Sequence, residues 1–336
     1  MEVEQTSILR SSSFRQSLIF SLFVIIGLIL VNILLFNAGQ VSIVLLSGLY
    51  QGMLFFLVAA GLSIVFGLLD VLNLAQGSFF MLGAYIGFFV YGSLGESTSI
   101  SLRFILALVS ATIGGLILGA IMERWLIRPL YSRPVFQIVL TLGVGTAFTE
   151  VIRAIYGPAG LIPIQPPEVL DTTFPIFGAK FETYRVFIIF IGALMMVIIM
   201  LLLQRTRLGI IIRAGVEDSD MVEALGINIR RIFTWVFALG CAIAALGGIT
   251  AAPYIGAHPG MGDQFLLSAV IVVVLGGMSS FEGTIVASIL IGITRATVEQ
   301  ISLQYFNTPV LASISILVIM IIVLLVKPSG LFGREA

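Results

Sequence analysis

Two polar interruptions in long apolar runs hold the side chains best suited to contact a solute. The first, residues 68–85 (LLDVLNLAQGSFFMLGAY), contains Asp70, Asn73, Gln76, Gly77 and Ser78. Polar groups at membrane depth cost free energy, so they usually face a cavity or another helix. A break containing glycine also frees backbone groups, which the protein or a water-filled path must satisfy. The alternative is a plain cytoplasmic connector between two spans.

The second interruption lies in the other half of the chain, at residues 272–287 (VVVLGGMSSFEGTIVA). Paired interrupted helices are the best sequence indication of a transport site. The alternative here is close helix packing through small residues. We therefore predict a substrate pathway formed by residues from both breaks: Asn73, Gln76, Gly77, Ser78, Gly276, Gly277 and Ser279.

The residues needed for several other kinds of chemistry are missing. A P-loop needs Lys followed by Ser or Thr, but Phe181 follows Lys180 and Pro328 follows Lys327. One histidine, His258, and one cysteine, Cys241, do not supply the usual ligands of a zinc site. We expect a non-catalytic chain with no catalytic residues, no metal site and no cofactor.

Composition indicates the class of fold. The chain is 59% hydrophobic and 10% charged, against roughly 25% charge in soluble domains. Its apolar runs reach the length of about 20 residues that crosses a bilayer as a helix. The chain is therefore expected to be a single all-α, polytopic membrane domain, residues 1–336, with about ten transmembrane or re-entrant helices, or eight in a variant in which 264–278 or 68–80 only re-enters the membrane. The ten segments are about 17–37, 41–67, 78–94, 102–124, 135–156, 184–204, 232–253, 264–278, 283–302 and 309–326.

The distribution of Lys and Arg predicts the sidedness. With the N-terminus inside, the interior segments carry twelve basic residues and the exterior segments four. Both termini are therefore expected in the cytoplasm, and the proline-rich loop 157–183 is expected to be extracytoplasmic. The first run exceeds a usual signal-peptide core, so we expect a retained span in the cytoplasmic (inner) membrane. The zero net charge argues against nucleic acid as a partner.

The densest group of charges is the stretch 204–231, which holds five Arg and four acidic residues. Within it, 217–225 is predicted to form a short helix with acids in its first turn and Gly226 as its C-terminal cap. Met221, Val222 and Leu225 would form a small apolar face on that helix. By composition alone a solvated cytoplasmic loop is the commoner interpretation, and a partner-binding helix is the alternative.

Ionisable residues inside the spans are few. Glu150 and Arg153 are spaced i,i+3, and Arg295 and Glu299 are spaced i,i+4. Structural ion pairs are the expectation for both, because such spacings place side chains on one helix face. An ion-coupled carrier that uses Glu150, Arg295 or Glu299 is kept as the competing function.

Four stretches together resemble the LivH-type permeases of branched-chain amino acid ABC transporters, a family that also includes urea and amide permeases. They are GLSIVFGLLDVLNLAQGSFFMLGAY (61–85), RPLYSRPVFQIVLTLG (128–143), RTRLGIIIRAGVEDSDMVEALGINIRRIFTWVFALG (205–240) and HPGMGDQFLLSAVIVVVLGGMSSFEGTIVASILIG (258–292). The resemblance runs from about residue 40 to 333. One departure is Gln76, where the family often has His; Gln keeps hydrogen-bonding capacity but does not titrate.

The resemblance implies an importer permease for branched-chain or other hydrophobic amino acids, or alternatively for urea, short amides or other amino acids. Its implied partners are a second related permease in a hetero- or homodimer, two ABC ATPase subunits, and an extracytoplasmic substrate-binding protein. The stretch 205–231 would be the cytoplasmic coupling loop. Its ATPase-coupling residues would be Glu217, Asp220, Met221, Val222, Glu223, Ala224, Leu225 and Gly226.

Overall fold

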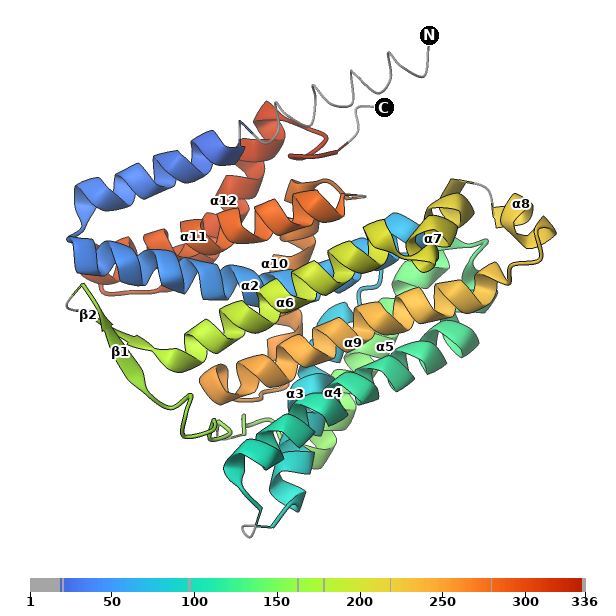
Figure 1. Ribbon diagram of the computed structural model, residues 1–336, viewed down its shortest axis with the longest axis horizontal. Coiled ribbons are helices and arrows are strands. Elements are labelled where there is room, and N and C mark those ends of the chain that lie inside the picture. Colours follow the sequence, from blue (N-terminus) through green and yellow to red (C-terminus); the bar gives the residue numbers. More distant parts are fainter. Residues whose placement is uncertain are drawn as a thin grey trace.

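The computed structural model describes residues 19–333 apart from 20, 96, 97, 162, 178, 218 and 279, and also leaves the side chains of 216–220 undescribed. The described chain is helical almost throughout (Figure 1). Its apolar helices confirm an all-α, polytopic membrane protein.

The helix bounds follow the apolar runs. The helices are Ser21–Leu35, α2 (Ala38–Leu69), α3 (Gln76–Ser93), α4 (Ile100–Met122), α5 (Pro134–Tyr156), α6 (Thr183–Arg205), α7 (Arg207–Glu217), α8 (Ser219–Ala224), α9 (Ile229–Ile255), α10 (Met261–Gly276), α11 (Phe281–Phe306) and α12 (Val310–Val326). A π-helical turn, η1 (Glu123–Ile127), and a 3₁₀ turn, η2 (Arg128–Leu130), continue α4. Every one of the ten predicted apolar segments coincides with a helix.

In the described part of the chain, six of these helices are long and apolar enough to cross a membrane. They are α2, α4 with its η1 and η2 extension, α5, α6, α9 and α11. The helices Ser21–Leu35, α10 and α12 are apolar but shorter. All-helical construction follows from the membrane environment, because a helix satisfies every backbone polar group within one segment.

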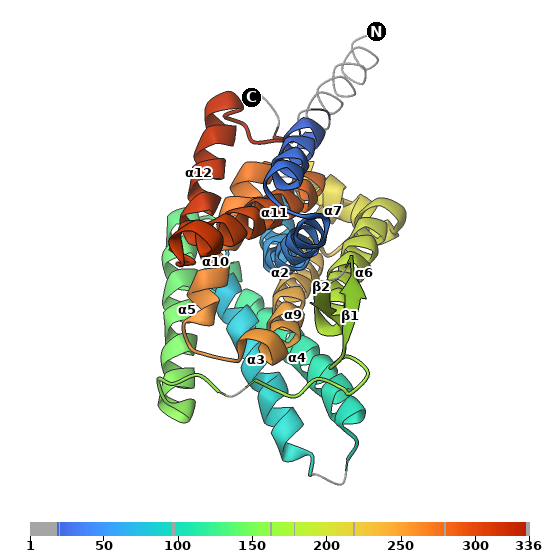
Figure 2. The same cartoon turned by 90° about the vertical axis from the view of Figure 1, so that its left-hand side faces the viewer.

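A central helix, α2, organises the bundle. Figure 2 shows α2 nearly end-on, surrounded by α6, α9, α10 and α11. In the most apolar 18-residue window of α2, 78% of the residues are buried, against 17% in that of α6. Small residues permit this close packing: a Cβ atom built at Gly52 on α2 would lie 2.7 Å from the carbonyl oxygen of Ser288 on α11.

The two predicted loops lie at opposite ends of α6. The loop 157–183 contains an antiparallel hairpin, β1 (Thr173–Ile176) and β2 (Ala179–Glu182), and leads directly into α6. The other end of α6 leads into α7 and α8 (Figure 1). The 23 residues of α6 separate these ends by about 35 Å.

Candidate functional site

The first interruption is a non-helical segment between α2 and α3. The α2 helix ends at Asp70, whose backbone is left-handed with φ 53°, and α3 begins at Gln76. Asn73 and Gln76 are both fully buried. The Gln76 Nε2 atom donates a hydrogen bond to the carbonyl oxygen of Gly240 on α9, at 2.8 Å. Asn73 Nδ2 donates to Gln76 Oε1, at 3.0 Å.

This break lies inside the helix bundle. Gly240 is eleven residues from the first residue of α9, which is roughly 16 Å along a helix. A Cβ atom built at Gly61 would overlap the Gln76 amide, and Gly61 is itself eight residues before the end of α2. Asn73 and Gln76 are therefore packed inside the protein and do not lie on its surface.

Helix α5 forms a second wall of the break. The backbone N–H of Leu74 donates to Thr141 Oγ1 at 3.2 Å, and Ser78 Oγ donates to the carbonyl oxygen of Gly145 at 3.0 Å. The side chains of Asn73, Gln76 and Ser78 are thus hydrogen-bonded within the protein in this conformation. Their amide and hydroxyl groups can exchange hydrogen bonds with a solute, which suits binding and not acid or base chemistry.

Helix α10 approaches the break from a third side. A Cβ atom at Gly77 would overlap the carbonyl oxygen of Gly262 and approach Leu266 Cβ to 2.6 Å. Gly77 is therefore required by packing against α10, whatever its part in transport.

The second interruption has a different construction. Gly277 has φ 101°, a backbone conformation that favours glycine. A Cβ atom at Gly276 would lie 2.5 Å from the carbonyl carbon of Gly283, so α10 and α11 touch through their backbones here. Leu331 N donates to the Leu275 carbonyl oxygen, at 2.8 Å, and holds the C-terminal segment against the turn. Ser279 lies outside the described residues.

The two breaks are not side by side. Gly262, which meets the first break, and Gly276, which forms the second, are fourteen residues apart on α10, or about 21 Å. Sequence reasoning missed the α5 wall of the first break. Its signal was present as a stripe of small and polar residues spaced four apart on α5, all of them buried: Gln137, Thr141, Gly145 and Thr149.

Comparison with known protein families identifies the group of proteins to which the chain belongs. The model for "branched-chain amino acid transport system / permease component" matches residues 44–324. The chain belongs to this permease family. LivH of Escherichia coli (strain K12), a high-affinity branched-chain amino acid transport system permease protein, is 27% identical over 300 residues, covering 86% of this chain and 94% of its own.

Other relatives of the permease extend the likeness. A probable branched-chain amino acid transport permease protein LivH of Methanocaldococcus jannaschii is 27% identical over 322 residues, which covers 91% of this chain and 96% of its own. LivM of Escherichia coli (strain K12) is 29% identical over 273 residues, which covers 72% of this chain and 61% of its own. A solved chain from PsaBC of Streptococcus pneumoniae in complex with Fab superposes with a TM-score of 0.44 at 15% identity, covering 90% of this chain and 94% of that chain.

The charged stretch 204–231 of the permease contains the end of α6, the helices α7 and α8, and the start of α9. Gly226 has φ 82°, and Ile227 N donates to the Val222 carbonyl oxygen at 3.3 Å, which is the bond expected of a glycine-capped helix end. The C-terminal cap is confirmed. Helix α8, Ser219–Ala224, lies within the range predicted as a helix, 217–225, and Glu217 belongs to α7. Residue 218 lies outside the described residues.

The prediction of an apolar face formed by Met221, Val222 and Leu225 is corrected at Val222. Val222 is only 4% exposed, so it packs inward, whereas Met221 and Leu225 are 64% and 74% exposed. The outward surface of α8 therefore consists of Met221 and Leu225, with Glu223, Ala224 and Gly226 exposed beside them. The side chains of Glu217 and Asp220 lie outside the described set.

The two predicted ion pairs differ in outcome. Arg153 Nη1 and Glu150 Oε1 are 2.5 Å apart on the exposed surface of α5, which confirms that pair. The Arg295–Glu299 pair is absent from the ion pairs of the described residues. Instead, Glu299 accepts from Gln51 Nε2 at 3.1 Å, and the Arg295 guanidinium lies 5.4 Å from the Phe55 ring centre. The α2–α11 contact diverts both side chains.

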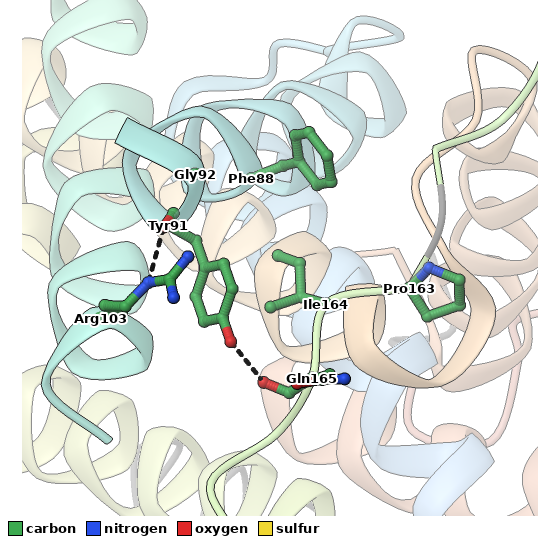
Figure 3. A pocket seen from close by; sticks show the side chains of 7 residues that line it. All are labelled: Phe88, Tyr91, Gly92, Arg103, Pro163, Ile164 and Gln165. Carbon is green, nitrogen blue, oxygen red and sulfur yellow. Dashed lines mark hydrogen bonds between the residues drawn. The ribbon is translucent and has the colours of Figure 1, made fainter. Parts of the chain in front are cut away.

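A small open pocket lies at the far end of α3, next to the loop 157–183 (Figure 3). The Arg103 guanidinium lies over the Tyr91 ring at 4.2 Å, and Tyr91 Oη donates to the Gln165 carbonyl oxygen at 3.2 Å. The residues that line the pocket are Phe88, Tyr91, Gly92, Arg103, Pro163, Ile164 and Gln165. The Tyr91 bond attaches the loop to α3, and the Arg103 contact attaches α4 to α3.

Proposed function

We propose that this chain is the membrane-spanning subunit of an ATP-driven importer for branched-chain or other hydrophobic amino acids. In this proposal, α8 is the coupling helix that two partner ATPases displace, and the break at 70–78 contributes to the substrate pathway. The permease itself performs no catalysis, and ATP hydrolysis belongs to its partners.

One observation carries this proposal: α9 contacts both elements. Near the start of α9, Arg230 Nε lies 3.7 Å from Glu223 Oε1 on α8. In the middle of α9, the Gly240 carbonyl oxygen accepts from Gln76. The ten residues between these points span about 15 Å of continuous helix. Movement of α8 can therefore be transmitted to the break through this part of α9.

The charge distribution supports the sidedness of the proposal. Arg205, Arg207, Arg213, Arg230 and Arg231 lie at the α7–α8 end of the bundle, which fits the excess of Arg and Lys on cytoplasmic loops. We place both termini on that side of the cytoplasmic membrane and assign eight to ten transmembrane or re-entrant helices. The re-entrant candidates are the segment 68–80 and α10. The hairpin loop 157–183 is then extracytoplasmic.

The proposed partners follow from the family and from the surface. LivM, named as a permease of a branched-chain amino acid system, is itself a relative, which supports a second related permease beside this chain as a hetero- or homodimer. The outer faces of α5 and α6 expose large apolar side chains, including Val139, Leu142 and Phe190, which suit lipid or a second permease. The remaining partners are two ABC ATPases and an extracytoplasmic binding protein.

The substrate class rests on hydrogen bonding at the first break. Asn73, Gln76, Gly77 and Ser78 are proposed to line the path when α5 and α9 separate, and Gly276, Gly277 and Ser279 are proposed as a second contribution. Uncharged amides and hydroxyls suit a zwitterionic amino acid, and they also suit urea or a short amide. Competition between leucine, urea and acetamide for uptake separates these substrates.

Reconstitution tests the mode of energy coupling. Vesicles that contain the permease pair, the ATPases and the binding protein should accumulate labelled leucine only with internal ATP. Uptake by this chain alone, driven by an ion gradient and abolished by Glu150→Gln or Arg295→Gln, would instead establish the carrier.

A substitution on α8 tests the docking role. Leu225→Asp introduces a charge at a side chain that is 74% exposed, so the chain should still fold, but ATPase association in a pull-down should be lost. Val169→Asp is the matched control, because Val169 is 78% exposed and lies in the opposite loop. Full ATPase association and ATP-coupled uptake with Leu225→Asp would remove α8 from the coupling role.

The single native cysteine, Cys241, is fully buried, so an engineered surface cysteine can report sidedness. In intact cells, a membrane-impermeant thiol reagent should label Val169→Cys and leave Leu225→Cys unlabelled. The reverse pattern would overturn the proposed orientation.

A further inference from the structure

A buried acidic residue outside both breaks joins three segments of the permease. Glu123 opens the π-helical turn η1 and is completely buried. Arg128 binds its carboxylate through two nitrogen atoms, with Nε to Oε1 at 3.3 Å and Nη2 to Oε2 at 3.2 Å. Tyr131 Oη donates to Glu123 Oε1 at 2.7 Å. Burial and this hydrogen bond raise the pKa of Tyr131, so the phenol stays protonated as the donor.

The same arginine also holds the start of α9. Arg128 Nη2 donates to Thr234 Oγ1 at 2.5 Å and to the Arg230 carbonyl oxygen at 3.2 Å. Arg230 is the residue whose side chain reaches Glu223 on α8. The Tyr131 ring packs edge-on against Phe233, with ring centres 6.0 Å apart. The Arg128 guanidinium thus connects the segment between α4 and α5, residues 123–133, to the end of α9 that contacts α8.

The α4–α5 segment is in turn attached to the wall of the first break. Gln137 Nε2, in the second turn of α5, donates to the Leu130 carbonyl oxygen at 2.7 Å. Thr141, one turn further along, accepts from Leu74 N in the break. The two helices that bond to the break, α5 and α9, are therefore joined at the same end through Arg128.

Structural anchoring alone is the simpler interpretation of this cluster. A buried ion pair is weak evidence for stability, because desolvation offsets much of the attraction. An anchor confined to the α4–α5 segment would need only Glu123, Arg128 and Tyr131. The further bonds from Arg128 to α9 cross between elements, and they start beside the contact with α8.

We propose that Glu123 and Arg128 form a second coupling element, in which they act as positioning residues that make α5 move together with α9 when α8 is displaced. This inference rests on the proposed function. Without the Glu123–Arg128 pair, α9 alone would move with α8. The two helices that bond to the break, α5 and α9, would then no longer move together.

The sharpest test is Thr234→Val, which removes the hydroxyl that accepts from Arg128 and leaves Glu123, Arg128 and Tyr131 unchanged. In vesicles with the ATPases and the binding protein, we expect ATP hydrolysis to continue and leucine transported per ATP to fall about fivefold or more, the lower range of typical coupling factors. Arg128→Lys, which keeps the charge but loses the two-nitrogen geometry, should lower the same ratio.

Thr146→Val is the matched control, because it removes a hydroxyl on the exposed side of α5 and should leave transport per ATP unchanged. The proposed role of Glu123 and Arg128 is overturned if the Thr234→Val and Arg128→Lys complexes assemble normally and transport as much leucine per ATP as the unsubstituted complex. Failure of the proposed function is distinguishable, because the unsubstituted complex would then show no ATP-dependent uptake. If Arg128→Lys fails to assemble, Thr234→Val alone decides the outcome.

Discussion

The breaks at 70–78 and 276–283 look alike in sequence and differ in structure. Both interrupt apolar runs with glycine and small polar residues. The first is held by side chains, since Asn73, Gln76 and Ser78 all donate hydrogen bonds. The second is held mainly by backbone contact between Gly276 and Gly283. Side-chain hydrogen bonds can be exchanged for a solute, whereas direct backbone packing leaves no room for one, so the first break is the stronger candidate for substrate contact.

The largest expected loss of stability applies to both breaks, because each contains a glycine that packs directly against the backbone of a neighbouring helix. Gly77→Ala and Gly283→Ala each force a methyl group onto a carbonyl oxygen of the neighbouring helix. Overpacking against atoms that cannot rotate away should cost about 3 kcal/mol of unfolding free energy. Thermal unfolding of the purified complex in detergent measures the loss. Gly143→Ala, where nothing lies within 4 Å, is the control, and equal midpoints would refute the packing role.

The next effect should be confined to the second break. Leu331 is fully buried, and its N–H bonds to the end of α10. Leu331→Ala should therefore cost about 2 kcal/mol, the lower end of the range for a buried leucine. Leu325→Ala, at a side chain that is 78% exposed, should be close to neutral. If both variants unfold at the same temperature, the C-terminal segment does not support this turn.

Side-chain chemistry separates the two breaks. Gln76→Ala removes the bonds to Asn73 and Gly240, which should cost about 1–3 kcal/mol and also weaken the apparent affinity for leucine uptake. Ser280→Ala removes the bond from Gly283 N, an N-cap interaction worth about 1 kcal/mol, with uptake retained. Transport assays in vesicles measure both variants. Normal uptake and affinity with Gln76→Ala would remove Gln76 from the pathway.

The smallest effect concerns the α5 wall of the first break. Thr141→Val leaves the N–H of Leu74 without its hydrogen-bond partner, which should cost about 1 kcal/mol. Hydrogen exchange of residues 72–76 should accelerate in this variant and stay unchanged in Thr146→Val, whose hydroxyl lies on the exposed side of α5. Unchanged exchange in Thr141→Val would mean that α5 does not stabilise the break.

Helix positions were largely predictable from the sequence, and contacts between helices were not. Long apolar runs determine where helices form, because the membrane requires backbone bonds to close within a segment. Val222 shows the limit on a short helix: hydrophobicity predicted an apolar face there, but only the packing of α8 shows that Val222 points inward. Arg295 and Glu299 show the same limit, since neighbours on α2 compete successfully with helical spacing.

The sequence by itself determined the class of protein, the family, and the two positions where apolar helices are interrupted. These features depend on composition and local spacing, which the chain carries without reference to its neighbours. Only the tertiary structure decided that Gln76 bonds to α9, that the second break is a packed turn, and that Arg128 joins α5 to α9. The contacts of Gln76 and Arg128 join residues more than 100 positions apart, and the alignment of helices, not local spacing, brings such residues within bonding distance.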